Sequence, residues 1–163
     1  MDAETLNLLV EFNQWANNRI YRKVAHLDPE RLSEPNWLSG GNLRRTLFHQ
    51  IDSQRFWRVG CQAGQFPAEE LEETDFLEVR VLRKLSQDED QALLDFAASL
   101  TSEELKRPVT IKLPRARPRQ RILWYILQHV LNHNTHHRAE IGQYLATIGA
   151  SPGDMDFVRF VGK

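Results

Sequence analysis

The segment from about Arg119 to Ile148 limits the fold more than any other part of the sequence, because it predicts a single long helix. Its apolar residues recur at three- and four-residue steps, the period of a helix with one buried face. Gly149 would end the helix, and Pro152 lies just beyond it. At 1.5 Å per residue, such a helix is about 45 Å long.

Three earlier segments carry apolar residues at the same period and predict three more long helices. The expected ranges are 3–26, 42–61 and 74–100, with Asn42 as N-cap of the second and Thr74 or Asp75 as N-cap of the third. Ser86-Gln87-Asp88-Glu89 has the pattern of a capping box, so the third helix is expected to break or restart near Ser86.

A short extended segment is expected just before the last helix. The residues from Pro108 to Pro114 alternate and are rich in β-branched side chains, while the prolines at both ends keep the segment short. Four long helices without a convincing sheet indicate an all-α protein. We therefore predict a four-helix bundle that forms one domain over residues 1–163.

The composition excludes several classes of protein. The net charge is -1, so no overall charge attracts nucleic acid or an anionic membrane. No apolar run approaches the roughly 20 residues of a membrane span, and the N-terminus lacks the pattern of a secretory signal. The single cysteine, Cys61, fits a reducing compartment. We expect a cytoplasmic protein with neither nucleic acid nor membrane as a partner.

Charge is nevertheless uneven along the chain. Residues 69–78 hold six acidic residues and no base, whereas residues 106–121 hold seven bases and no acid. Both runs fit solvated connections between helices. In a second interpretation, the basic run forms a docking rim for an anionic substrate. It has no interleaved aromatic residues, which argues against single-stranded nucleic acid.

Four of the six histidines lie within nine residues of the last predicted helix: His129, His133, His136 and His137. Residues four apart share a helical face, so His133 can pair with His129 or with His137 on one metal ion. The spacing does not choose between these pairs. His129 and His137 are about 12 Å apart along the axis, too far to share an ion. His136 points about 100° away from His137.

A third ligand must come from another helix. Of the remaining histidines, His26 ends the first predicted helix, and His49 lies in an apolar part of the second. The apolar residues around His49 indicate a position in the core. A buried histidine pair on the last helix could, however, lie opposite His49 and share a metal ion with it. Asp52, one turn further on, is a candidate ligand or hydrogen-bond partner. These residues predict a three-histidine site, and three protein ligands leave a position open for chemistry.

Three stretches resemble motifs of the DinB/YfiT-like family of metal-dependent proteins, whose superfamily includes thiol-dependent transferases and maleylpyruvate isomerase. Residues 12–19 (FNQWANNR) are similar to the first-helix motif, and residues 47–51 (LFHQI) to the second-helix histidine motif. Residues 128–141 (QHVLNHNTHHRAEI) match the fourth-helix signature closely. The resemblance extends along nearly the whole chain.

The resemblance implies a bundle in up-down-down-up order, often a homodimer, with a divalent ion held by His49, His133 and His137. It therefore favours His137 over His129. Ala139-Glu140 departs from the Gly-Gln that commonly follows the His-Arg pair in the family, which concerns the substrate pocket more than the metal. Three imidazoles suit zinc or nickel, and also admit manganese or iron.

The superfamily implies transfer of a low-molecular-weight thiol to a small electrophile. One alternative is metal-dependent hydrolysis with Asp52 or Glu140 as the base. Another is a non-catalytic metal-binding bundle of the stress response, whose site Asp52 or His129 would close as a fourth ligand. An enzyme is the favoured interpretation.

Overall fold

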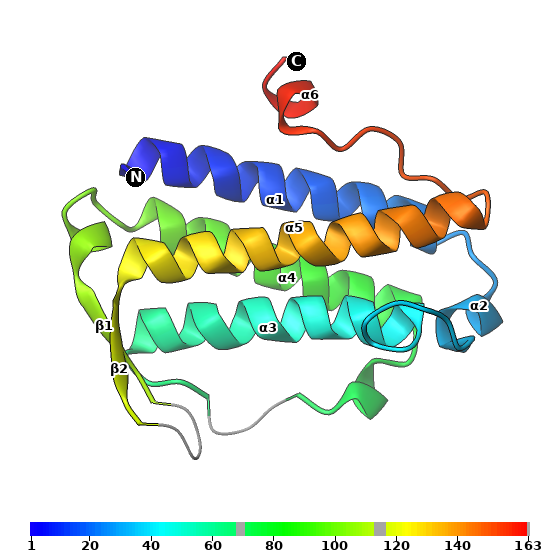
Figure 1. The fold of residues 1–163 in the computed structure, drawn as a ribbon, viewed down its shortest axis with the longest axis horizontal. Helices are drawn as coiled ribbons and strands as arrows, with labels where there is room; N and C mark the ends of the chain where they lie inside the picture. Colours follow the sequence, from blue (N-terminus) through cyan, green and yellow to red (C-terminus); the bar gives the residue numbers. More distant parts are fainter. Residues whose placement is uncertain (68–70, 113–116, 163) are drawn as a thin grey trace.

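Four long helices dominate the computed structural model, which describes residues 1–67, 71–112 and 117–162 (Figure 1). They are α1 (Ala3–Val24), α3 (Leu43–Ala63), α4 (Val79–Ala98) and α5 (Leu123–Thr147). The shorter elements are α2 (Pro29–Ser33), the 3-10 helices η1 (Glu73–Phe76) and η2 (Glu104–Lys106), the strands β1 (Pro108–Ile111) and β2 (Arg119–Ile122), and α6 (Phe157–Val161). α1 and α3 each pack against both α4 and α5. The mostly helical fold that the sequence predicts is confirmed.

Local sequence signals explain several helix ends. The Asn42 side chain accepts a hydrogen bond from the backbone N–H of Arg45 at 2.9 Å, so the predicted N-cap of α3 is confirmed. Gly149 follows the C-cap of α5 with φ of 75°, a left-handed conformation that favours glycine. α1 ends at Val24, two residues before the expected end.

The last long helix begins later than predicted. Residues Arg119–Ile122 are not helical but form β2, which pairs antiparallel with β1. Their backbone pairs with β1 along one edge, and α5 starts only at Leu123. The expected extended segment is thus present from Pro108 to Ile111, with a partner strand that the sequence did not suggest. Its last predicted residues, 113 and 114, lie outside the described part of the chain.

The predicted break at Ser86 is wrong, because α4 is continuous from Val79 to Ala98. A capping box needs the Glu89 side chain to reach back to the first residue of the box. Instead, both Glu89 oxygens accept hydrogen bonds from Arg58 on α3, at 2.6 and 2.7 Å. Ser86 is buried inside the bundle. Thr74 and Asp75 lie in η1 and do not cap α4.

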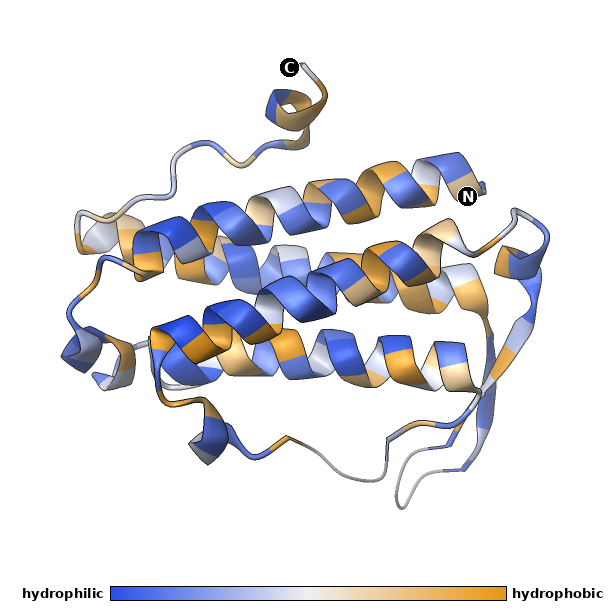
Figure 2. Cartoon of the chain, turned by 180° about the vertical axis from the view of Figure 1, so that it is seen from behind, coloured by the Kyte–Doolittle hydropathy of each residue, from blue (hydrophilic) through white to orange (hydrophobic). Residues whose placement is uncertain are grey.

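The apolar core is divided into two clusters, one toward each end of the bundle. The first contains Leu6, Leu93 and Leu127, and the second contains Ile20 and Leu145 among others. Hydrophilic residues occupy the level between them, as the colouring along the middle of α4, the helix in front in Figure 2, shows. The bundle is therefore apolar, polar and apolar along its length.

We call the middle level the polar layer and define it by seven residues from all four long helices. Each is at most 6% exposed: Asn13, Asn17, Gln50, Gln54, Asp90, Asn134 and Arg138. A guanidinium only donates hydrogen bonds and a carboxylate only accepts them. Arg138 donates to Asn17 Oδ1 at 3.1 Å, and Asn17 Nδ2 donates to Asp90 at 2.9 Å. Because Arg138 can only donate and Asp90 can only accept, the hydrogen bonds that link them through Asn17 have one possible donor-to-acceptor direction.

The polar layer also orients the helices that carry the histidines. His49, His133 and His137 each come directly before one of its members. Those members are Gln50, Asn134 and Arg138. Successive helical residues are about 100° apart, so burial of the layer turns the three histidines toward the flank of the bundle.

None of the described helices has the length and apolar character needed to cross a membrane.

Candidate metal centre

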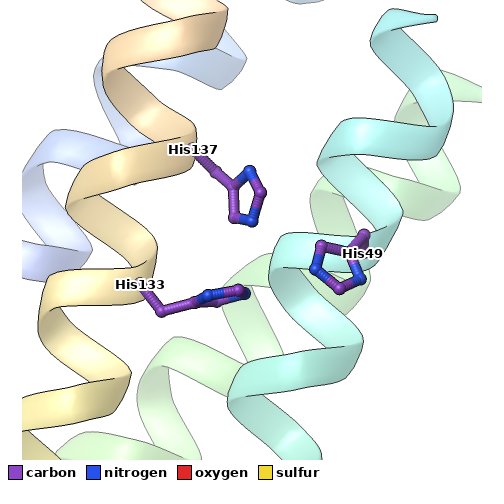
Figure 3. A group of neighbouring side chains, drawn as sticks. All are labelled: His49, His133 and His137. Carbon is purple, nitrogen blue, oxygen red and sulfur yellow. The ribbon is translucent and has the colours of Figure 1, made fainter. Parts of the chain in front are cut away.

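His49 on α3 meets His133 and His137 on α5, in the groove between the two helices (Figure 3). The ring centroid of His49 lies 5.2 Å from that of His133 and 5.0 Å from that of His137. The His133 and His137 centroids are 4.4 Å apart. One ring nitrogen from each histidine lies within 4.8 Å of the other two, a spacing suited to holding one metal ion.

This cluster lies at the surface of the bundle and not in its core. His137 is buried and His133 half-buried, but His49 is exposed. The core position that its apolar neighbours indicated for His49 is therefore wrong, whereas His137 lies among the buried residues of α5. The stripe that faces the core holds Asn134 and Arg138, the next residue after each histidine. The cluster is consequently accessible to small molecules.

Glu140 holds the His137 ring. Its Oε2 lies 2.9 Å from His137 Nδ1, and it also accepts a hydrogen bond from the Ser39 hydroxyl at 2.8 Å. A carboxylate only accepts, so the proton of the neutral imidazole lies on Nδ1 and the lone pair on Nε2. A carboxylate that fixes the tautomer in this way is common behind metal-bound histidines. Glu140, considered from the sequence as a base, thus lies where it can orient the His137 ring.

Ser39 reaches Glu140 because its loop packs tightly against the start of α3. The backbone N–H of Gly40 donates to the Thr46 hydroxyl at 3.2 Å. A Cβ at Gly40 would lie 2.7 Å from the Thr46 backbone nitrogen, so a side chain here would push the loop away. The Ser39 contact was not predicted from the sequence, in which only the small residues of Ser39-Gly40-Gly41 indicate a close approach of the chain.

His133 has a ring nitrogen that a metal ion would satisfy. Its Nε2 is buried and has no hydrogen-bond partner among the described residues. Burial, together with the neighbouring histidines, lowers the pKa of His133 to about 4, and burial also lowers the pKa of His137. Both rings are therefore neutral near pH 7, the form that binds metal.

The other histidines do not belong to this group of three possible ligands. The exposed His129 ring is 5.9 Å from that of His133 and packs against Trp57, 5.3 Å away. His136 is exposed, and its nearest carboxylate oxygen, on Glu140, is 3.8 Å away. With His137 and Glu140 it forms a second group of possible ligands, but that group uses the carboxylate that supports His137. His26 lies exposed beyond the end of α1.

A hollow of about 680 Å³ opens beside the cluster. Its walls include His49, His137 and Ser39, and Asp52 also lines it. Asp52 forms an ion pair with Arg55, with a distance of 3.8 Å between nitrogen and oxygen. Among the described residues, neither Asp52 nor His129 joins the three histidines in one group of ligands. The arrangement thus leaves room for water or a small ligand at a bound ion.

The Glu140 contact gives a direct prediction. Glu140→Ala should weaken divalent-metal affinity by about 10- to 100-fold, because His137 loses the group that fixes its tautomer and ring orientation. Glu140→Gln keeps an oxygen that can accept the same N–H and should lose much less. Titration of the metal-free variants with zinc would measure both. Equal affinities for Glu140→Ala and the unchanged protein would remove Glu140 from the site.

The fold and the site together define a helical-bundle protein with an open three-histidine cluster in a surface groove. The DinB family model matches residues 1–162, and the chain belongs to the DinB family. The family resemblance drawn from the three sequence motifs is thereby confirmed. No curated protein matches the chain.

Proposed function

We propose that this DinB-family protein is a divalent-metal-dependent enzyme that transfers a low-molecular-weight thiol to a small electrophile. The proposal rests on the openness of the site. Within the described residues, three histidines converge without a fourth histidine, cysteine or carboxylate in their group, and a hollow adjoins them. A structural site would be closed by a fourth ligand, whereas a catalytic site keeps a position free.

His49, His133 and His137 would hold the ion, and the residues present fit it. The donor set is three imidazoles, with an unpartnered buried nitrogen on His133 and a carboxylate behind His137. Zinc and nickel are our first choices, with manganese or iron as alternatives. When bound, the ion would favour ionisation of a coordinated thiol or water at neutral pH.

The chain itself offers no thiol for this reaction. Cys61 is fully buried, and burial raises the pKa of its thiol to about 12. An external thiol in the hollow therefore supplies the sulfur. The sulfur forms a bond to the electrophilic carbon, the leaving group departs with its bonding electron pair, and the thiol proton passes to solvent. The hollow beside His49 and His137 would orient the thiol for this attack.

The proposal includes the up-down-down-up order of the long helices and a homodimer, both implied by the family resemblance. The course of the chain in Figure 1 supports the helix order, since α1 and α5 run opposite to α3 and α4.

The test combines elemental analysis with activity. Purified protein should carry about one divalent ion per chain, and the metal-loaded form should consume cellular thiols in the presence of a chlorinated aromatic electrophile. The chelated form should be inactive, and activity should return when metal is added. Bound metal without activity toward any thiol would leave hydrolysis, with Asp52 lining the hollow, as the better function. A metal that stabilises the fold but supports neither reaction would favour the non-catalytic bundle.

A further inference from the structure

A second pocket, of about 340 Å³, lies next to the three-histidine cluster along α5. It forms where the β-hairpin meets the start of α5 and the later part of α3 (Figure 1). The lining residues are Trp57, Ile111, Arg121, Tyr125, Ile126 and His129. The His129 ring links the pocket to the cluster, since its centroid is 5.9 Å from that of His133.

The walls of this pocket are mainly apolar and aromatic. Trp57 packs edge-on against His129, with 77° between the ring planes. Ile126 is buried, whereas Tyr125 is 48% exposed, and both line the pocket. Aromatic walls of this kind bind flat apolar groups through dispersion and offset ring contacts. The pocket therefore suits an aromatic ring.

Arg121 gives the pocket a positive charge. It lies opposite Val109 in the hairpin, so both side chains are on the same face, and Val109 is buried against the bundle. One guanidinium nitrogen donates to the Gln120 carbonyl at 2.8 Å. Across residues 1–67, 71–112 and 117–162, Arg121 forms no ion pair, and no acidic residue lines the pocket. A guanidinium with free N–H groups binds a carboxylate strongly and in a defined orientation.

We propose that this pocket binds a small aromatic carboxylate, with its ring between Trp57 and Tyr125 and its carboxylate on Arg121. As far as catalysis is concerned, the inference rests on the proposed function, in which this ligand is the electrophile. Its reactive carbon then lies past His129 toward His133, while the thiol enters from the larger hollow beside His49. The basic run of residues 106–121 thus acts through one residue, Arg121, which faces the pocket. Arg115 of that run lies outside the described residues.

Binding can be measured without metal or catalysis. Calorimetric titration of the chelated protein with 2-naphthoate should show saturable binding at one site. Arg121→Gln should weaken 2-naphthoate binding about tenfold, the usual value of a charged hydrogen bond. The same variant should leave the affinity for the neutral 2-naphthamide unchanged, because the amide has no charge for Arg121 to bind. Trp57→Ala should weaken both ligands.

Arg119→Gln is the matched control. It removes the same charge from the same face of the same strand, but Arg119 does not line the pocket. Its affinity for 2-naphthoate should change less than twofold. An equal loss in the Arg119 and Arg121 variants, or no binding by the unchanged protein, would overturn the pocket assignment. A protein that binds 2-naphthoate but carries no metal would instead refute the proposed function and leave the pocket standing.

Discussion

Replacement of His133 by alanine is expected to reduce bound metal from about one ion per chain to a trace. The His133 ring centroid lies 5.2 Å from that of His49 and 4.4 Å from that of His137, and its buried Nε2 has no hydrogen-bond partner among the described residues. Loss of one of three imidazoles leaves two ligands, too few for a stable site in a groove open to water. His49→Ala and His137→Ala should behave alike. Elemental analysis after dialysis measures the result directly.

His136→Ala is the control for this series. It removes an imidazole from the same helix, one residue from His137, but its ring is exposed and stands outside the cluster. It should retain the full complement of metal. If His136→Ala lost the metal while His49→Ala kept it, the ion would belong to the group of His136, His137 and Glu140 instead. Full metal in all three cluster variants would refute the assignment altogether.

The largest loss of stability is expected from Asp90→Asn, at roughly 3–5 kcal/mol. The substitution leaves the buried Arg138 charge without the carboxylate that compensates it. If the new amide oxygen replaces Oδ1, which accepts from Asn17 and Gln54, its N–H₂ group replaces Oδ2, which accepts from Asn17 at 3.2 Å. Asn17 cannot simply turn its amide round, because its oxygen accepts from Arg138 and Gln50. Urea unfolding of the two proteins measures the difference.

Asp88→Asn is the matched control, since Asp88 is an exposed residue of the same helix whose ion pair with Lys84 faces solvent. It should change the free energy of unfolding by less than about 0.5 kcal/mol. Adding Arg138→Met to Asp90→Asn should cost less than the sum of the two single losses, because the double variant leaves neither charge alone. Strict additivity would show that the two charges do not depend on each other.

Features that depend on local sequence could be predicted. Apolar periodicity located all four long helices, and Asn42 and Gly149 marked two of their ends correctly. The four-residue spacing on the last helix left His129 and His137 as alternative partners of His133, because one lies a turn before it and the other a turn after it on the same face. The family motif favoured His137, and the structure brings His137 beside His49. Metal binding by this set stays a prediction until it is measured.

Features that depend on contacts between distant segments could not be predicted. Asn13 and Asn17 lie on the buried face of α1, but apolar periodicity does not identify them because they are polar. Their role appears only when four helices bring amides and charges to one level. Ser86-Gln87-Asp88-Glu89 looked like a helix start because the sequence does not show that Glu89 binds Arg58. Likewise, Arg119–Ile122 becomes a strand because β1 lies beside it.

The polar layer bears on how the protein would exchange a metal ion bound by the three histidines. Hydrogen bonds made by Gln50, Asn134 and Arg138 fix the rotation of α3 and α5 about their own axes and their positions along the bundle. These bonds require no ion. The metal-free groove is thus already shaped, in contrast to small zinc domains that fold only around their ion. Chelation should empty the site without unfolding the chain, and a different divalent ion could then enter. Which metal the protein carries would follow from supply in its surroundings, because the fold is complete before the metal arrives.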